Sequence, residues 1–178
     1  MYPGLNLREE ILKEHSKSQR DKIVAWVGSS KQRFDVLFNL FLNDEYRVTQ
    51  RAAWPVSYCV QEHPEFIKDN FAKLLKNLEK PNLHDAIKRN AVRLLQHVAI
   101  PKKHQGQVMN ICFEYLESPT EAVAIKAFSL TVLGNLSEQY PEIIPEVKLL
   151  IEDQLPHQTP AFKSRAKTFL KLVRQKNK

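Results

Sequence analysis

Apolar and polar positions alternate along this chain in one recurring arrangement. An apolar residue or threonine is followed four positions later by an alanine and three positions after that by a second large residue. Four segments share the arrangement and align without gaps, 49–56, 87–94, 123–130 and 162–169. Positions i, i+4 and i+7 lie on one face of an α-helix, and a small residue between larger ones lets a neighbouring helix approach closely. The pattern therefore predicts four closely packed helices.

The four helices recur at a nearly constant interval. Their alanines are Ala53, Ala91, Ala127 and Ala166. A second apolar run precedes each of them, at 34–42, 66–78, 108–116 and 143–155. A period of roughly 38 residues is typical of stacked helical hairpins. We therefore expect hairpins at about 31–62, 65–100, 104–139 and 142–176, with residues 1–28 as an N-terminal cap.

Composition agrees with a helical protein. The chain has 178 residues, 43% of them apolar, with 4 glycines and 10 prolines. Most prolines lie where a helix would start or stop, as in the entry turns His63-Pro64 and Tyr140-Pro141. Long helices joined by short turns fit this usage better than a glycine-punctuated sheet. We expect a single all-α domain over 1–178.

The period, the helix pairing and the alanine motif resemble HEAT and armadillo repeats over most of the chain. The segments beginning Ile87-Lys88 and Phe162-Lys163 also carry the base that often follows the first apolar residue of such repeats. The resemblance implies a right-handed α-α superhelix of about four hairpins plus the capping helices. It also implies a concave face lined by the second helix of each pair.

The stretch 47–58 resembles small bacterial HEAT-like proteins, some of which carry an adenylosuccinate lyase label. Membership of the lyase superfamily would require a serine-rich catalytic loop with a Met-Pro-Lys-Asn motif and a longer helical core. Only Ser29-Ser30 is reminiscent of that loop. This pair is typical of a helix N-cap. The sequence therefore gives the label no support.

The net charge of +7 is concentrated at one end of the sequence. Residues 1–155 contain 20 basic and 20 acidic residues, whereas seven basic residues and no acidic one follow Asp153. A protein that follows a long phosphate backbone usually spreads its positive charge along a groove. The basic C-terminal patch has two interpretations, a solvated face of a terminal repeat or a phosphate contact. Its residues are Lys163, Lys167, Lys171 and Arg174.

Catalytic and metal-binding motifs are missing from the sequence. Cys59 and Cys112 belong to no Cys-x-x-Cys or Cys/His cluster, and the six histidines lie in different segments. The acidic pairs Glu9-Glu10 and Asp44-Glu45 are expected to be solvated helix ends. We therefore predict a protein that is not an enzyme and uses no cofactor or metal. An N-terminus without an apolar stretch and the lack of a membrane-spanning run lead us to expect a cytoplasmic location.

A cationic and aromatic stripe distinguishes the second helix of the first hairpin. Arg47, Arg51, Trp54 and Tyr58 follow spacings of 4, 3 and 4, so they share a helix face. One interpretation is a binding patch, because arginine, tryptophan and tyrosine dominate interface hot spots. The other is that the aromatic rings pack against the N-terminal cap or the next hairpin. Pro55 in the same helix is expected to kink it or end it early.

Two functions fit these features. The first is a scaffold that binds a protein or peptide segment on its concave face, with no membrane involved. Its candidate contacts are Arg47, Arg51, Trp54, Tyr58, Arg89, Arg93 and Lys126. The second is a nucleic-acid-binding protein that resembles the DNA-alkylation-repeat glycosylases in architecture. The electroneutral stretch 1–155 favours the first.

Overall fold

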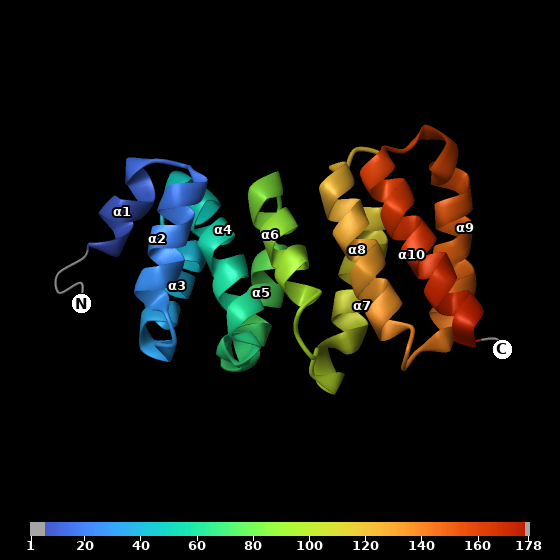
Figure 1. Cartoon of the computed structure of the whole chain (residues 1–178), viewed down its shortest axis with the longest axis horizontal. Helices are drawn as coiled ribbons and strands as arrows, with labels where there is room; N and C mark the ends of the chain where they lie inside the picture. The colour runs from blue at the N-terminus through green and yellow to red at the C-terminus, as the bar shows by residue number, and fades with distance from the viewer. Residues whose placement is uncertain (1–5, 177–178) are drawn as a thin grey trace. The chain divides into compact units, whose positions relative to one another are not determined.

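A computed structural model describes residues 6–176 of the chain. These residues form ten α-helices and three short 3₁₀ helices, with no strand among them (Figure 1). The predicted all-α fold is therefore confirmed. In chain order the helices are α1 (Leu7–Lys13), α2 (Lys17–Val27), α3 (Lys31–Asn43), α4 (Tyr46–Glu62), η1 (Pro64–Asn70), α5 (Phe71–Leu78), α6 (Asp85–Leu95), α7 (Lys102–Glu117), α8 (Val123–Leu136), η2 (Pro141–Ile143), α9 (Ile144–Gln154), η3 (Leu155–His157) and α10 (Pro160–Lys176).

The chain packs into two compact units, residues 1–99 and 100–178. The first contains α1 to α6 and the second contains α7 to α10. A single domain over the whole chain stays a prediction. Each unit is built from helical hairpins, in which consecutive antiparallel helices such as α3 and α4, or α7 and α8, pack along their length.

Helix α4 is the centre of the N-terminal unit. It packs against α3, its hairpin partner, and against α6, the corresponding helix of the next hairpin. The capping helices α1 and α2 also lie against α4, so α2, α4 and α6 run side by side (Figure 1). Its eight buried residues are Val48, Ala52, Ala53, Pro55, Val56, Ser57, Cys59 and Val60. The helix continues through Pro55, so the predicted early break does not occur.

The alanine motif marks the places where second helices meet. Ala53 of α4 and Ala91 of α6 are each 1% exposed. Helices α4 and α6 come close enough for Ser57 Oγ to donate to Asn90 Oδ1 across 3.2 Å. Asn90 in turn donates to the Ala86 carbonyl at 2.8 Å, which fixes its orientation. The two polar side chains are buried but bonded, as buried polar groups require.

The C-terminal unit repeats this packing with α8 and α10. Ala127 and Ala166 are buried in it at the same motif position. Gly134 of α8 allows a close approach, because a Cβ at this position would lie 3.3 Å from Cδ2 of Phe169 in α10. By contrast, α9 has far fewer contacts with α10 than α8 does. The last hairpin is therefore held mainly through α10.

Helix ends follow ordinary capping rules. Ser30 is the N-cap of α3 and accepts a hydrogen bond from the Arg33 amide at 3.3 Å, as serine commonly does at this position. Pro160 is the first residue of α10, where its missing N–H costs no helical hydrogen bond.

None of the helices in the described part of the chain is long and apolar enough to cross a membrane.

The acidic pair at residues 9 and 10 differs from the prediction of a solvated helix end. Glu10 is buried and accepts hydrogen bonds from Lys13, from Lys22 at 2.8 Å and from the Gln19 side chain at 2.9 Å. These bonds, led by the one from Lys13, lower the pKa of Glu10 from 4.5 to about 2, because they favour the charged form. Asp44 likewise accepts from Arg8 at 3.0 Å, which ties α1 to the start of α4.

We expect Glu10→Gln to lower the stability of the protein at neutral pH and to flatten its acid dependence. A carboxylate whose pKa is lower in the folded state stabilises above its unfolded pKa. For Glu10 that pKa is about 4.5, and the effect is lost as the pH falls towards 2. Thermal unfolding at a series of pH values in this window measures the difference. Glu9→Gln, a neighbour outside this network, is the control, and an equal response of both variants would contradict the assignment.

Candidate binding surface

The face of α4 that was singled out in the sequence meets the capping helices. Arg51 Nη1 donates to the Leu12 carbonyl at 2.7 Å and to the Ile11 carbonyl at 3.4 Å. Carbonyls in the last turn of a helix have no partner within it, so Arg51 completes the end of α1. Trp54 is half-buried beside His15, with ring centroids 5.4 Å apart.

Arg20 of α2 lies over both aromatic rings of α4. Its guanidinium carbon is 3.8 Å from the centroid of Tyr58 and 4.8 Å from that of Trp54. The two rings meet edge to face, 6.5 Å apart and 70° from parallel. Arg20 is only 6% exposed and donates from Nε to Asp21 at 2.8 Å. The ion pair and the two rings compensate the burial of its charge.

A second arginine also packs on the Tyr58 ring. Arg93 of α6 has its guanidinium carbon 4.2 Å from the centroid of the ring, so Tyr58 packs against arginines of both neighbouring helices. Hydrogen bonding and charge from Arg93, helped by the charge of Arg20, lower the pKa of the Tyr58 hydroxyl below 10.0, against the opposing effect of burial. The ring therefore connects α2, α4 and α6.

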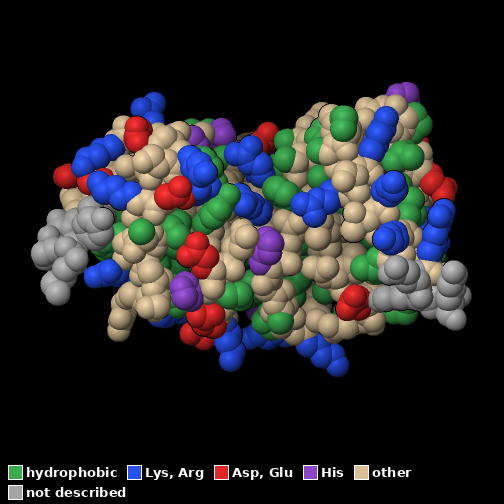
Figure 2. Space-filling model, viewed as in Figure 1, with side chains coloured by type: hydrophobic (Ala, Val, Ile, Leu, Met, Phe, Trp, Pro, Cys, Tyr) green, Lys and Arg blue, Asp and Glu red, His purple; other side chains and the backbone are tan. Residues whose placement is uncertain are grey.

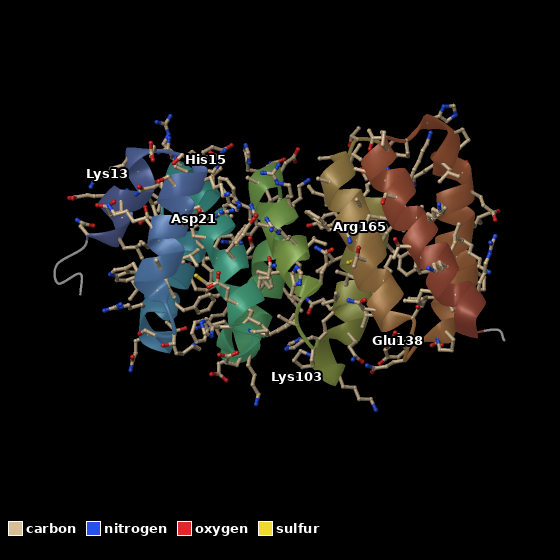
Figure 3. All side chains as sticks on the ribbon, in the orientation of Figure 1. Lys13, His15, Asp21, Lys103, Glu138 and Arg165 are labelled. Atoms are coloured by element: carbon tan, nitrogen blue, oxygen red, sulfur yellow. The ribbon has the colours of Figure 1, made fainter. Side chains whose placement is uncertain are left out.

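The pKa of His15 is lowered by its surroundings on this face. Partial desolvation, followed by the charges of Arg51 and Arg89, lowers its pKa below 6.5. His15 is therefore mostly neutral at pH 7. Figure 3 shows His15 immediately before α2 and Asp21 on α2.

Together these side chains form what we call the arginine–aromatic surface of the N-terminal unit. Asp21 is the one acidic residue that pairs with any of its arginines among the described residues. Lys and Arg side chains gather over this part of α4 and α6 (Figure 2). The surface consists of His15, Arg20, Arg47, Arg51, Trp54, Tyr58, Arg89 and Arg93.

The predicted contact residues differ in how the structure places them. Arg51, Trp54, Tyr58 and Arg93 come together through the contacts above, and Arg89 lies near enough to act on His15. Arg47 is exposed one turn before Arg51 in α4. Lys126 lies in the other unit, apart from these residues.

Lys126 does not lie on an open surface, contrary to the prediction for it. It is 4% exposed in the C-terminal unit, and its ammonium donates to Gln154 Oε1 at 2.8 Å. Burial lowers the pKa of its ammonium group. Gln154 also donates to the Leu116 carbonyl at 2.7 Å, so Lys126 belongs to a network that joins α7, α8 and α9.

The basic C-terminal patch is exposed along α10. Its lysines and Arg174 alternate with the buried stripe of Phe162, Ala166, Phe169 and Val173, which faces α8. Figure 2 shows Lys and Arg side chains along this helix. No acidic side chain pairs with the four patch residues in the part of the chain that the structure describes.

Two members of the surface, Arg20 and His15, are not among the residues that the sequence pattern predicted. For Arg20 a signal was present, because it precedes Ile23, Val24 and Val27 at spacings of 3, 4 and 7 and so lies on the apolar face of α2. A charged residue at such a position needs a partner within the fold. His15 lies in the turn before α2, where no periodicity could have placed it.

Catalytic chemistry gains no support from the side chains. Cys59 and Cys112 are buried free thiols, and burial raises the pKa of each to about 12. Such a value is far from that of a reactive thiolate. Within residues 6–176 no three His, Cys, Asp or Glu side chains come together as a metal site would require.

Comparison with known proteins agrees with this architecture. A model of the HEAT repeat domain matches residues 7–173. The chain belongs to the HEAT repeat family. No curated protein and no solved structure matches the chain. HEAT repeats generally form helical scaffolds for protein interactions, and the hairpins of both units are of this kind.

We expect Trp54→Ala to lower the free energy of unfolding by about 2 kcal/mol, less than the roughly 3–5 kcal/mol of a fully buried tryptophan. The substitution removes the ring on which His15 and Arg20 pack. Denaturant unfolding measures the loss. Tyr46→Ala is the control, because Tyr46 is an aromatic residue of the same helix that is 62% exposed. Equal losses would show that Trp54 does not hold the capping helices.

We expect Arg93→Met to raise the pKa of the Tyr58 hydroxyl. The variant removes a hydrogen bond and a positive charge, while burial continues to favour the neutral form. NMR titration of ¹³C-labelled tyrosine follows this group among the five tyrosines. Arg89→Met removes the same charge from the same helix and should leave Tyr58 nearly unchanged. A similar shift in both variants would mean that the contact with Arg93 has no special effect.

Proposed function

We propose that this HEAT repeat protein is a non-enzymatic scaffold that binds an acidic segment of a partner protein on the arginine–aromatic surface. The observation that carries the proposal is the excess of arginine over acid on α4 and α6. Arg47, Arg51, Arg89 and Arg93 have no carboxylate partner among the described residues, although other side chains of the same unit form ion pairs.

Such an excess is unfavourable in the free protein. The charges of Arg51 and Arg89, which add to desolvation in lowering the pKa of His15, also repel one another. An acidic ligand would relieve this repulsion, and guanidinium groups bind carboxylates with two parallel hydrogen bonds. Trp54 and Tyr58 are only half-buried, and their exposed parts add the aromatic area that interface hot spots use.

The two interpretations of the stripe combine in this proposal. Arg51 and Trp54 pack against the capping helices and thereby fix the surface, whereas Arg47 and Arg89 are exposed and carry no structural bond of that kind. We assign the first pair to positioning and the second pair to contact with the partner. Arg93 serves both, because it is half-buried against Tyr58.

Nucleic acid is the competing ligand. Arginines over aromatic rings also hold phosphates and stacked bases. Two features favour the peptide: residues 1–155 carry no net charge, and the rings of Trp54 and Tyr58 are already covered on one side by Arg20. A base could not stack on the ring faces that Arg20 covers.

We expect Arg47→Ala/Arg89→Ala to weaken binding of a fluorescent Asp/Glu-rich peptide by about fivefold or more, as truncation of hot-spot arginines does. The melting temperature should stay nearly constant because neither residue packs in the core. Fluorescence anisotropy measures binding. Bound peptide should also raise the pKa of His15, since its charge offsets those of Arg51 and Arg89.

Lys68→Ala/Lys76→Ala is the matched control, because it removes the same charge from exposed positions of η1 and α5. Equal weakening by both double variants would show that only net charge matters and would refute the proposed surface. A generic DNA duplex is the second probe. Tighter binding of the duplex than of the peptide, with a steep dependence on salt, would favour the nucleic-acid function instead.

A further inference from the structure

The last hairpin contains a groove that its own side chains do not fill. It has a volume of about 480 Å³ and lies entirely in the C-terminal unit. Its lining residues are Leu155, Lys163, Lys167, Leu170, Lys171 and Arg174. The sparse contact between α9 and α10 explains why space remains there.

The floor of this groove is apolar although its rim is charged. Leu155 is 36% exposed and Leu170 is half-buried. The aliphatic stems of the lysines extend the apolar area. Leu149 of α9 is 67% exposed in the same hairpin. Two of the four large apolar side chains exposed among the described residues thus belong to this hairpin, which a purely solvated end would not require.

All charged residues that line the groove are positive. Lys163, Lys167 and Lys171 follow one another at spacings of four, and Arg174 continues the row. Residues spaced in this way line one edge of a helix. These four cations have no acidic partner among the described residues. An occupant must therefore present apolar side chains to the floor and negative charge to the rim.

We propose that this groove is a second binding site, which receives an acidic amphipathic helix of another protein. An amphipathic helix supplies leucine-type side chains on one face and carboxylates on the flanking positions, which matches both parts of the groove. A symmetric contact between two copies of this face would place four cations opposite four cations, which disfavours self-association through it. A membrane surface is flat, whereas the leucines here lie in a recess between lysines.

The test uses the full chain and a designed helical peptide, with leucine at positions i, i+3, i+4 and i+7 and glutamate on the flanks. We expect this peptide to bind and Lys163→Glu/Lys167→Glu to weaken it by about tenfold or more, because charge reversal turns attraction into repulsion. Lys102→Glu/Lys103→Glu makes the same change of charge at exposed positions at the start of α7 and should bind normally (Figure 3).

Two further variants test the apolar floor. Leu170→Glu should abolish binding. If this variant does not fold, Leu170→Ser is the substitute, and it should weaken binding. A peptide with its leucines changed to serine keeps its charge but cannot fill the apolar floor. Measured on Arg47→Ala/Arg89→Ala, so that the arginine–aromatic surface does not contribute, it should bind at least about tenfold more weakly than the leucine peptide. Equal binding of that peptide, or of the original peptide to Lys163→Glu/Lys167→Glu, would overturn the proposal.

The remaining outcomes separate this site from its alternatives. Binding to phosphatidylglycerol vesicles but not to the peptide would identify a lipid surface as the ligand and overturn the proposal. Dimerisation that Leu170→Glu abolishes would show instead that a second copy occupies the groove. In the Arg47→Ala/Arg89→Ala background the leucine-containing peptide should still bind and should still respond to Lys163→Glu/Lys167→Glu, so failure of the arginine–aromatic surface and failure of this groove can be told apart.

Discussion

Close packing between the alanine-bearing helices is the constraint on which the rest of the structure depends. A second helix must bury one stripe against its hairpin partner and another against the second helix of the next hairpin. Small buried residues suit this geometry: Ala53 and Ala91 are buried in α4 and α6, and Gly134 of α8 lies against Phe169 of α10. Larger side chains there would separate the helices and break contacts such as Ser57 to Asn90.

This packing also determines which residues meet on the surface. Once α4 lies between α2 and α6, the residues next to its buried stripe point into the two seams on either side. Tyr58 therefore lies between Arg20 and Arg93, which come from helices far apart in the sequence. Arginine suits such a seam, because its planar group packs on a ring while its N–H groups remain free to bond. The cationic surface is a consequence of the helix spacing.

The repeats explain why so much of the fold could be predicted. An alanine between larger residues at i−4 and i+3 is a local signal, and four copies of it at a nearly constant interval leave little freedom for another architecture. The surface was harder to predict because its contacts join different helices. The stripe from Arg47 to Tyr58 is visible along α4, but its pairing with Arg20 depends on how α2 docks. Lys126 was predicted to be a surface contact but is buried. Its ammonium group bonds to Gln154, 28 residues away, and no local pattern indicates this partner. Glu10 likewise looked like an exposed helix end and is instead the acceptor that joins α1 to α2.

The two surfaces differ in a way that bears on the ligands each can select. In the N-terminal unit Arg51 rests on helix carbonyls and Arg93 on the Tyr58 ring, so the donors of these two arginines are held in place, whereas Arg47 and Arg89 are exposed. Preorganised donors lose little conformational entropy on binding and favour ligands whose carboxylates fit their spacing. The lysines of α10 are exposed, and their flexible stems can follow an acidic helix in more than one register. If the groove binds an acidic helix as proposed, its specificity would come from its apolar floor, because the fit of side chains against Leu155 and Leu170 would distinguish one amphipathic helix from another.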